Sequence, residues 1–589
     1  MATPRHPSDS VTDAPVYSFR RRALWFVSAT VTLVVVTSVA FWPGLDGDFL
    51  NWDDDRNFVD NMSYRGVGFE QLRWAWQTYH LGVWQPLSWL LLGLQYEIGG
   101  MDAAVYHRAS LVLHIINTVV FYVLAVVMAR VASTQTRRVS LSGVHLCAAG
   151  VAMLFAVHPL RVEAVAWISC QPYLPAALLY MLAVLAYIWG YRPLPSAMGG
   201  HPYATRWGWL TVVFVCYMTA VTSKAVAVTF PVVLLILDVY PLRRWGGRNG
   251  WLSRAGFRVW MEKLPFLVLA LLVSLWAAAA KDYSESRVPF SAYDVDARLA
   301  QSAYGVIFYL DKTIRPADLI PYYRLPEGLS LLAWRYGIPA ITVLVVTVGL
   351  VFMRRRWPAV LAAWFAYVVI LLPNLGVLQI SQQIATDRYS YVAILPVMLL
   401  LAGGLYRLWL RFSSGRWVVR SALVVGIVAA TTGLVSASRH QCLVWRDSVN
   451  LWQANLAVDP KCAVAECNLG AALLDMGDYV QASQHLSRAI DLQPDFAFAY
   501  SNLGTILYQA GHFEDAVMCY QQAITAAPGL GGLDLAKTHA GLGAAYEELG
   551  HYDQAWTHAI TASDLGFEKA QKLIDRLHAV SGAPREITP

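Results

Sequence analysis

Hydrophobic and polar positions divide the chain into two parts with different patterns. From about residue 23 to residue 435, long apolar runs alternate with short polar segments, whereas the chain beyond residue 440 is mostly polar. A helix needs about 20 apolar residues to cross the roughly 30 Å hydrocarbon layer of a bilayer. The first part therefore predicts an all-α bundle in a membrane, and the second predicts helices that fold in water.

The apolar runs predict about eleven membrane spans. Arginines cluster in five connecting segments, and alternate crossing places all five on one side, which the positive-inside rule makes cytoplasmic. We expect a cytoplasmic tail over 1–22, a transmembrane domain over 23–440 and an exported domain over 441–589. The expected spans are 23–42, 105–130, 142–157, 172–190, 206–222, 225–240, 262–280, 336–353, 357–373, 390–410 and 417–437. The basic segments contain Arg20 to Arg22, Arg137 and Arg138, Arg243 to Arg248, Arg354 to Arg356, and Arg407 to Arg416.

Two long segments, 43–104 and 281–335, fall on the expected outer face. The first contains an apolar stretch over 84–98, which we interpret as interfacial or re-entrant, after an amphipathic helix with Leu72 and Trp76 on its apolar side. The second has a helical pattern between Leu299 and Leu310. Such elements could roof an active site or only lie on the membrane surface, and the pattern favours neither.

The polar tail repeats with a period of 34 residues. Leu469-Gly470, Gly477 and Ala482 recur as Leu503-Gly504, Gly511 and Ala516, and a third copy begins at Leu542-Gly543. Half a unit with Trp452 and Pro460 precedes them. This period is typical of the tetratricopeptide repeat, an α-solenoid of helix pairs. Such solenoids usually bind an extended peptide or a partner protein, and a structural lid is the alternative.

Composition supports a polytopic membrane protein and excludes some partners. Hydrophobic residues make up 57% of the chain and charged residues 14%, against about 25% in soluble domains. The net charge of +6 comes with arginines in short loops, so it indicates topology and no nucleic-acid surface. The seven cysteines show no metal-ligand spacing. Cys462 and Cys467 read as buried thiols, and a disulfide involving Cys442 or Cys519 stays open.

Ionisable residues gather at the predicted outer ends of the spans. A run of three carboxylates, Asp53 to Asp55, follows the first span, and Lys224, Lys312 and Arg388 fall on the same face. A surface Asp run is most often a solvated cap, but ionisable groups in apolar context are costly unless paired. The three cations predict a receptor for a lipid phosphate, with carboxylates nearby for proton transfer. Further candidates on this face are His158, Glu163, Asp387 and Tyr389, although a histidine such as His158 is more often a packed or helix-end residue than a catalytic one.

Several strings carry a family resemblance. They are FLNWDD from Phe49 with Arg56 and Asn61, then HPLRVEAVAW, SKAVAVTFPVVLLILDVYPL, YLDKTIRPADL and ATDRYSYVAILP, followed by the repeats. In order and spacing the chain resembles the transmembrane and tetratricopeptide-containing O-mannosyltransferases and their bacterial relatives, which are C-type membrane glycosyltransferases. The resemblance implies transfer of mannose or another hexose from a polyprenyl-phosphate donor to a protein hydroxyl or a glycan on the non-cytoplasmic face.

The resemblance also implies residue roles. The family's Asp pair falls on Asp53 and Asp54, one of which would take the proton of the acceptor hydroxyl in an inverting reaction, while Asp55 occupies a variable position. Lys224, Lys312 and Arg388 would balance the charge of the leaving phosphate. The lipid-linked sugar is then the co-substrate, and a divalent cation on the Asp pair is compatible with the sequence but not required by it. The repeats would present the exported acceptor.

One departure from the family pattern leaves alternatives open. Relatives continue the HPL motif into a segment with a basic residue followed by Asp, whereas this chain has neutral residues from Ser169 through Cys170 to Leu174. The donor or acceptor could differ, or the chain could be an inactive membrane scaffold that binds partners through its repeats. A transporter is a third hypothesis, favoured only by the number of spans. We expect a bacterial inner membrane location with periplasmic repeats.

Overall fold

The computed structural model describes residues 14–133, 140–191, 202–246, 250–251, 253–283, 293–376, 383–412, 417–526 and 531–581. Residues 1–13 of the predicted tail, Arg137, Arg138, Arg248 and Arg416 lie outside the described residues. The chain forms two compact units. Unit 1 comprises Met1–Phe49, Asp53–Leu319 and Tyr323–Arg446, and unit 2 comprises Leu50–Trp52, Ile320–Tyr322 and Asp447–Pro589.

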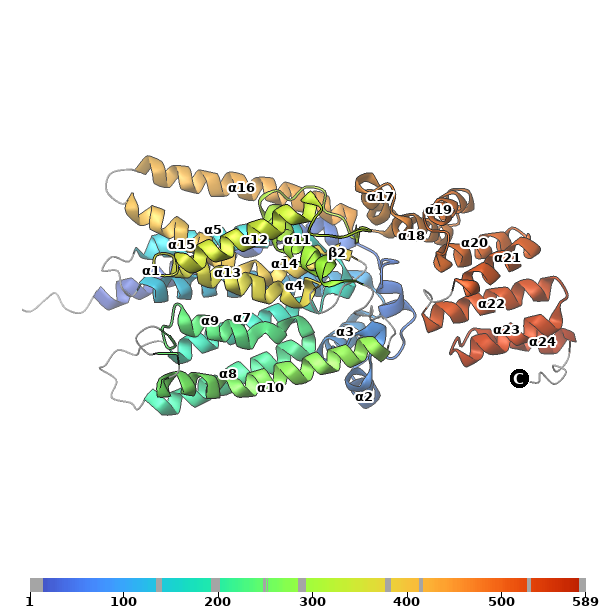
Figure 1. Ribbon diagram of the computed structural model, residues 1–589, viewed down its shortest axis with the longest axis horizontal. Helices are drawn as coiled ribbons and strands as arrows, with labels where there is room; N and C mark the ends of the chain where they lie inside the picture. The colour runs from blue at the N-terminus through green and yellow to red at the C-terminus, as the bar shows by residue number, and fades with distance from the viewer. Residues whose placement is uncertain are drawn as a thin grey trace, which may run out of the picture. The chain divides into compact units, whose positions relative to one another are not determined.

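Unit 1 is a helical bundle whose long helices run in similar directions (Figure 1). At its centre α4 packs against α5 and α7, and α7 packs against α8. A two-stranded antiparallel sheet, β1 (Tyr323–Arg324) with β2 (Gln383–Ala385), joins two of its loops. The helices are α1 (Ala14–Phe41), α2 (Phe69–Gln77), α3 (Pro86–Gly99), α4 (Ala103–Ser133), α5 (Leu141–Ala156), α6 (Val162–Ala166), α7 (Tyr173–Tyr191), α8 (Pro202–Ser223), α9 (Phe230–Val239), α10 (Arg254–Tyr283), α11 (Val295–Ile314), α12 (Trp334–Phe352), α13 (Pro358–Leu371), α14 (Ser390–Ala393), α15 (Leu395–Arg411) and α16 (Trp417–Val444).

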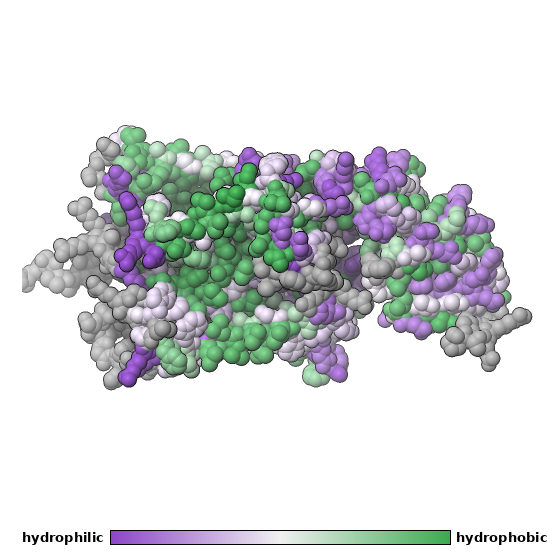
Figure 2. All heavy atoms as spheres, viewed as in Figure 1, coloured by the Kyte–Doolittle hydropathy of each residue, from purple (hydrophilic) through white to green (hydrophobic). Residues whose placement is uncertain are grey.

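The predicted count of about eleven spans is not confirmed. Among the described residues, 6 helices are long and apolar enough to cross a membrane, or up to 8 if two bent helix pairs each count as one span. The remaining predicted spans fall on shorter apolar helices, Trp207–Ser223, Ala225–Val239 and Pro358–Asn374. At 1.5 Å per residue, the 10-residue helix α9 is too short to cross the hydrocarbon layer alone, whereas the 22 residues of α8 are long enough. Figure 2 shows a broad hydrophobic surface over unit 1, with hydrophilic residues concentrated toward its ends, as a membrane protein requires.

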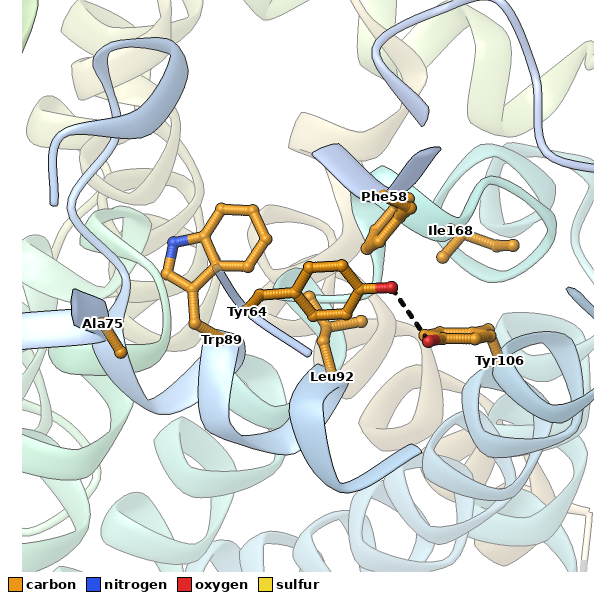
Figure 3. Close-up of a cluster of buried hydrophobic side chains, with 7 residues drawn as sticks. All are labelled: Phe58, Tyr64, Ala75, Trp89, Leu92, Tyr106 and Ile168. Carbon is orange, nitrogen blue, oxygen red and sulfur yellow. Dashed lines mark hydrogen bonds between the residues drawn. The ribbon is translucent and has the colours of Figure 1, made fainter. Parts of the chain in front are cut away.

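The first predicted outer segment is helical. The expected amphipathic helix is α2, on which Leu72 and Trp76 are 40% and 44% exposed. The apolar stretch after it forms α3, which buries Trp89 and Leu92. These side chains join Phe58, Tyr64, Ala75, Tyr106 and Ile168 in an aromatic cluster (Figure 3). In the second outer segment, α11 covers the predicted helical stretch.

Unit 2 contains eight helices among its described residues, most of them paired as the repeat predicts. Helices α18 and α19, α20 and α21, and α22 and α23 form the three antiparallel pairs. Gly470 and Gly504 allow the helices of the first two pairs to lie close together. A Cβ at Gly470 would lie 2.7 Å from the Leu486 side chain, and one at Gly504 would lie 3.0 Å from the Tyr520 side chain. Gly477 and Gly511 have φ near +80°, which favours glycine at a helix end. The bounds are α17 (Ser448–Val458), α18 (Ala463–Asp475), α19 (Tyr479–Leu492), α20 (Ala497–Gln509), α21 (Phe513–Thr525), α22 (Gly532–Glu548), α23 (Tyr552–Asp564) and α24 (Ala570–Ser581).

A buried ionic cluster joins α7, α9 and α10 in unit 1. Asp238 and Lys263 are fully buried, and Lys263 Nζ lies 2.8 Å from Asp238 Oδ2. The Arg244 guanidinium lies 2.8 Å from Asp238 Oδ1. We expect Asp238→Leu to lower the free energy of unfolding by about 3–5 kcal/mol, because it leaves the buried Lys263 ammonium without its main counterion. Thermal unfolding in detergent measures this. Glu262→Gln, at the more exposed edge of the cluster, is the control and should cost much less.

Candidate active site

The Asp run forms a tight loop between the end of the first span and a single π-helical turn, Asp55–Val59. Asp53 has a φ of +67°, a conformation that is uncommon for non-glycine residues. Asp54 is fully buried, and its Oδ1 accepts hydrogen bonds from the Ser169 backbone N–H at 2.9 Å and from the Ser169 hydroxyl. The Asn57 side chain donates to the same hydroxyl at 2.9 Å. The Asp54 carboxylate therefore anchors the loop to Ser169.

The aromatic cluster fixes the far end of this loop. Phe58, in the π-helical turn, packs edge-on against Tyr64 with ring centroids 5.6 Å apart. Figure 3 shows Phe58 above the hydrogen-bonded pair of Tyr64 and Tyr106, whose hydroxyls lie 3.0 Å apart. His80 supports the loop from its other side, with Nε2 lying 3.1 Å from the Arg56 carbonyl oxygen. The loop is thus held rigidly on both sides.

Asp53 is partly buried and lies among cations. Burial raises the pKa of its carboxyl above the ordinary 3.8, while the charges of Arg56, Arg388 and Lys224 oppose that rise. The structure therefore brings Asp53, Lys224 and Arg388 within electrostatic range of one another, as the sequence analysis predicts for a site. A buried carboxyl among cations is a candidate for proton transfer.

Lys224 lies in the break between α8 and the 3-10 helix Ala225–Thr229. Its Nζ donates to Gln85 Oε1 at 2.9 Å and lies 5.4 Å from the centre of the Tyr173 ring. Burial lowers the pKa of this ammonium to about 8. Among the described residues Nζ has this one hydrogen-bond acceptor, so two of its three protons are available to a ligand.

Arg388 is bound to Glu163. The Arg388 backbone N–H donates to Glu163 Oε2 at 2.6 Å, and the guanidinium pairs with Oε1 of the same carboxylate. The guanidinium carbon also lies 5.2 Å from the Trp167 and Tyr389 ring centres. Glu163 is 2% exposed. The carboxylate therefore orients Arg388, whose guanidinium also interacts with the Tyr173 hydroxyl.

The remaining predicted residues have supporting positions. Asp387 is buried and accepts a 3.0 Å hydrogen bond from the Tyr323 hydroxyl. His158 is a helix-end residue, since its Nδ1 accepts from the Leu160 N–H at 3.2 Å and its Nε2 lies 3.0 Å from the Thr313 carbonyl oxygen. Lys312 donates to the Ala317 and Asp318 carbonyls. Its charge acts on Asp387, so it belongs to the periphery of the site.

Neutral side chains occupy the segment in which the family resemblance leads us to expect charges. Ser169 binds Asp54, as described above. Gln171 is 1% exposed, and its amide nitrogen donates to Ser110 Oγ at 2.9 Å and to the Tyr106 carbonyl at 3.1 Å. Its amide oxygen accepts from Gln95 at 2.6 Å. The polar atoms of the buried Gln171 side chain are therefore all hydrogen-bonded.

The sequence did not indicate which side chains hold the predicted ones. Ser169 and Asn57 bind around Asp54, Gln85 binds Lys224, and Tyr323 binds Asp387. Gln85 had a signal, because it is a polar residue between Trp84 and Pro86 in an apolar stretch. In the described part of the chain no group of three or more His, Cys, Asp or Glu residues could hold a metal ion. All seven cysteines are free thiols.

Comparisons with known proteins address both parts of the sequence. Two family models match the tail, "Tetratricopeptide repeat" over residues 495–564 and "TPR repeat" over residues 470–511. Protein O-mannosyl-transferase Tmtc3 of Drosophila melanogaster is 22% identical over 493 residues, which cover 75% of this chain and 52% of that protein. Protein O-mannosyl-transferase TMTC4 of Mus musculus is 23% identical over 504 residues, which cover 78% of this chain and 65% of that protein.

The chain is a relative of the TMTC protein O-mannosyl-transferases. The resemblance in the sequence motifs is thereby confirmed, as are the tetratricopeptide repeats. The chain spans between half and two thirds of the length of these relatives. The activity named for these relatives is therefore a hypothesis for this chain.

Proposed function

We propose that the chain is a membrane glycosyltransferase that moves a hexose, such as mannose, from a polyprenyl-phosphate donor to a hydroxyl of an exported protein or glycan. The observation that carries the proposal is the placement of one partly exposed carboxylate, Asp53, beside two cations, Lys224 and Arg388. The TMTC relatives support the reaction class. The reaction would take place on the non-cytoplasmic face, in a bacterial inner membrane with periplasmic repeats.

In this proposal Asp53 is the general base and Asp54 fixes the loop. The acceptor hydroxyl oxygen forms a bond to the anomeric carbon while the bond from that carbon to the phosphate oxygen breaks. The electron pair of that bond leaves with the polyprenyl phosphate, and the hydroxyl proton passes to the Asp53 carboxylate. Attack from the side opposite the phosphate inverts the anomeric centre. The Asp54 carboxylate is less suited to this role because it is fully buried and bound to Ser169.

Lys224 and Arg388 would bind the donor phosphate and stabilise the charge it gains as the bond breaks. Glu163 and Gln85 orient these two cations before the donor arrives, and preorganised charges act most strongly where water is excluded. Lys312, at the periphery, would contribute to the field without contact. Asp387 and Tyr389 would hold the Arg388 turn in place, and His158 would cap the neighbouring helix. This step balances without a divalent metal ion, and a metal ion on the Asp pair stays the alternative.

The direct test is transfer of label from radiolabelled polyprenyl-phosphate mannose, and from other hexose donors in parallel, to an exported-protein extract by purified protein in detergent. Label in an acceptor would support the proposal and identify the sugar. Absence of transfer from every donor would favour the inactive scaffold. In that case deletion of 461–589 should reproduce the full phenotype of a null strain.

The pH dependence of transfer follows from the two shifted groups. Asp53 must be ionised to act as a base, so kcat/KM should fall as the pH drops through its raised pKa. Lys224 must be protonated to bind phosphate, so kcat/KM should also fall as the pH rises through about 8. The expected profile is a bell that reports on the free enzyme.

The matched control is Lys224→Arg, because an arginine stays charged at all accessible pH values. This variant should keep the acidic limb and move the alkaline limb to higher pH. If the alkaline limb of Lys224→Arg lies at the same pH as in the wild type, a group other than Lys224 causes the loss of activity at high pH.

A further inference from the structure

Two short segments from the outer loops belong to the repeat unit. Leu50–Trp52 and Ile320–Tyr322 fold with Asp447–Pro589 in unit 2. Leu50 is 1% exposed, and Trp452, against which Trp52 packs edge-on at 5.2 Å, is fully buried. The ring of Trp52 also meets Tyr322, with centroids 5.8 Å apart. The two segments thus pack against each other as well as against the repeat helices.

Asn51 forms hydrogen bonds to the repeat helices with its backbone N–H and with the nitrogen and oxygen of its side-chain amide. Its backbone N–H donates to Ser448 Oγ at 2.9 Å, and its Nδ2 donates to the Asn468 carbonyl at 2.8 Å. Its Oδ1 accepts from the Trp452 indole N–H at 2.7 Å. Three hydrogen bonds from two different helices leave Asn51 a single position and orientation.

One face of α17 supplies most of these contacts. Ser448, Trp452 and Asn455 are spaced four and three residues apart, which places them on the same side of the helix. Asn455 Oδ1 accepts a 3.1 Å hydrogen bond from the Tyr322 backbone N–H. This face of α17 is therefore occupied by loop segments of the same chain, and an acceptor would have to bind elsewhere on the repeats.

Each held segment is followed directly by a residue of the candidate active site. Trp52 is followed by Asp53, whose positive φ requires a fixed backbone on both sides. Tyr322 is followed by Tyr323, whose hydroxyl binds Asp387. The chain before the Asp pair is thus held by Asn51, while Ser169 holds Asp54 and, through Asn57, the turn that follows.

We propose that Asn51 is a positioning residue for the Asp53–Asp54 pair, so that α17 of the repeat unit is required for transfer itself and not only for acceptor binding. The inference rests on the proposed function. A loosened Asn51 would let Asp53 leave its productive position without removing any group that contacts the donor. The rate of the chemical step should then fall while donor affinity is kept.

The test compares Asn51→Asp and Ser448→Ala with the matched control Ser501→Ala in the full-length protein. Asn51→Asp keeps the volume but places an oxygen against the Asn468 carbonyl, and we expect kcat to fall by about 10²-fold, the scale of a misplaced catalytic group. Ser448→Ala removes one hydrogen bond, and we expect about a tenfold loss. Ser501→Ala also removes one hydroxyl contact in unit 2, with Thr538 at 2.9 Å, and should leave kcat unchanged.

Two further readouts separate positioning from general damage to the fold. The KM for the donor should stay at the wild-type value in Asn51→Asp and Ser448→Ala, and amide hydrogen exchange over residues 53–57 should rise in both. Wild-type kcat in both variants, or an equal loss in Ser501→Ala, would overturn the inference while the proposed function stands. If Asn51→Asp does not fold, Ser448→Ala decides. No transfer by the wild-type protein would overturn the proposed function and this inference with it.

Discussion

Replacing Asp53 with Asn is expected to lower kcat by about 10²–10⁴-fold, the usual contribution of a positioned general base. The amide cannot take the acceptor proton, yet it has the size of the carboxyl and keeps the loop geometry. Expression and thermal unfolding in detergent should stay close to wild type, because burial of the Asp53 carboxylate already opposes its ionisation. The measurement is transfer under saturating donor, with label counted in the acceptor.

Asp55→Asn is the matched control, because it makes the same chemical change two residues along the same run. The Asp55 carboxylate accepts from the Arg56 backbone N–H at 2.9 Å and should not be needed for chemistry. Wild-type transfer by Asp53→Asn would reject Asp53 as the base. If Asp55→Asn loses as much transfer as Asp53→Asn, the run acts as a charge cluster and no single base can be assigned.

Asp54→Asn should also impair transfer, but for a different reason. Its buried carboxylate holds Ser169, so the variant should lose the loop position while Asp53 keeps its proton chemistry. The acidic limb of the pH profile should therefore survive in Asp54→Asn at reduced rate. Disappearance of that limb in Asp54→Asn alone would exchange the roles of the two residues.

The hydrophobic pattern predicted the architecture well because membrane helices and helical repeats both have strong periodic signals. The positions of Gly470 and Gly504, one repeat apart, predict the close helix approach that the structure shows at Leu486 and Tyr520. The span count was less reliable, because the apolar run 225–240 does not reveal that α9 begins only at Phe230, and the run 390–410 does not reveal that its two helices are bent by 53°. Length along the sequence is not the same as length across a bilayer.

The ionisable residues of the candidate site could be predicted from the sequence, but the side chains that hold them in place could not. Asp53, Lys224 and Arg388 stand out because ionisable residues are rare in apolar context. Ser169 and Asn51 lie in segments that the sequence singles out, but their supporting roles do not show, since their partners lie more than a hundred residues away in the sequence. Only the folded chain identifies them.

Removing Arg388 is the second change with a large expected effect. Arg388→Met should lower transfer by about 10²–10³-fold, the cost of losing one donor to a developing negative charge. It should also lower the free energy of unfolding by about 3–5 kcal/mol, because the buried Glu163 carboxylate would lose its partner. These two effects are mixed in the single variant, so activity alone cannot show that Arg388 meets the donor.

The double variant Arg388→Met with Glu163→Gln separates them. A neutral amide at position 163 no longer needs a cation, and its oxygen can still accept from the backbone N–H at position 388, so thermal stability should return toward wild type. Transfer should stay at the level of Arg388→Met if the guanidinium binds the donor phosphate. Recovery of transfer together with stability would show instead that Arg388 only neutralises Glu163, and the phosphate site would then have to be built on Lys224 alone.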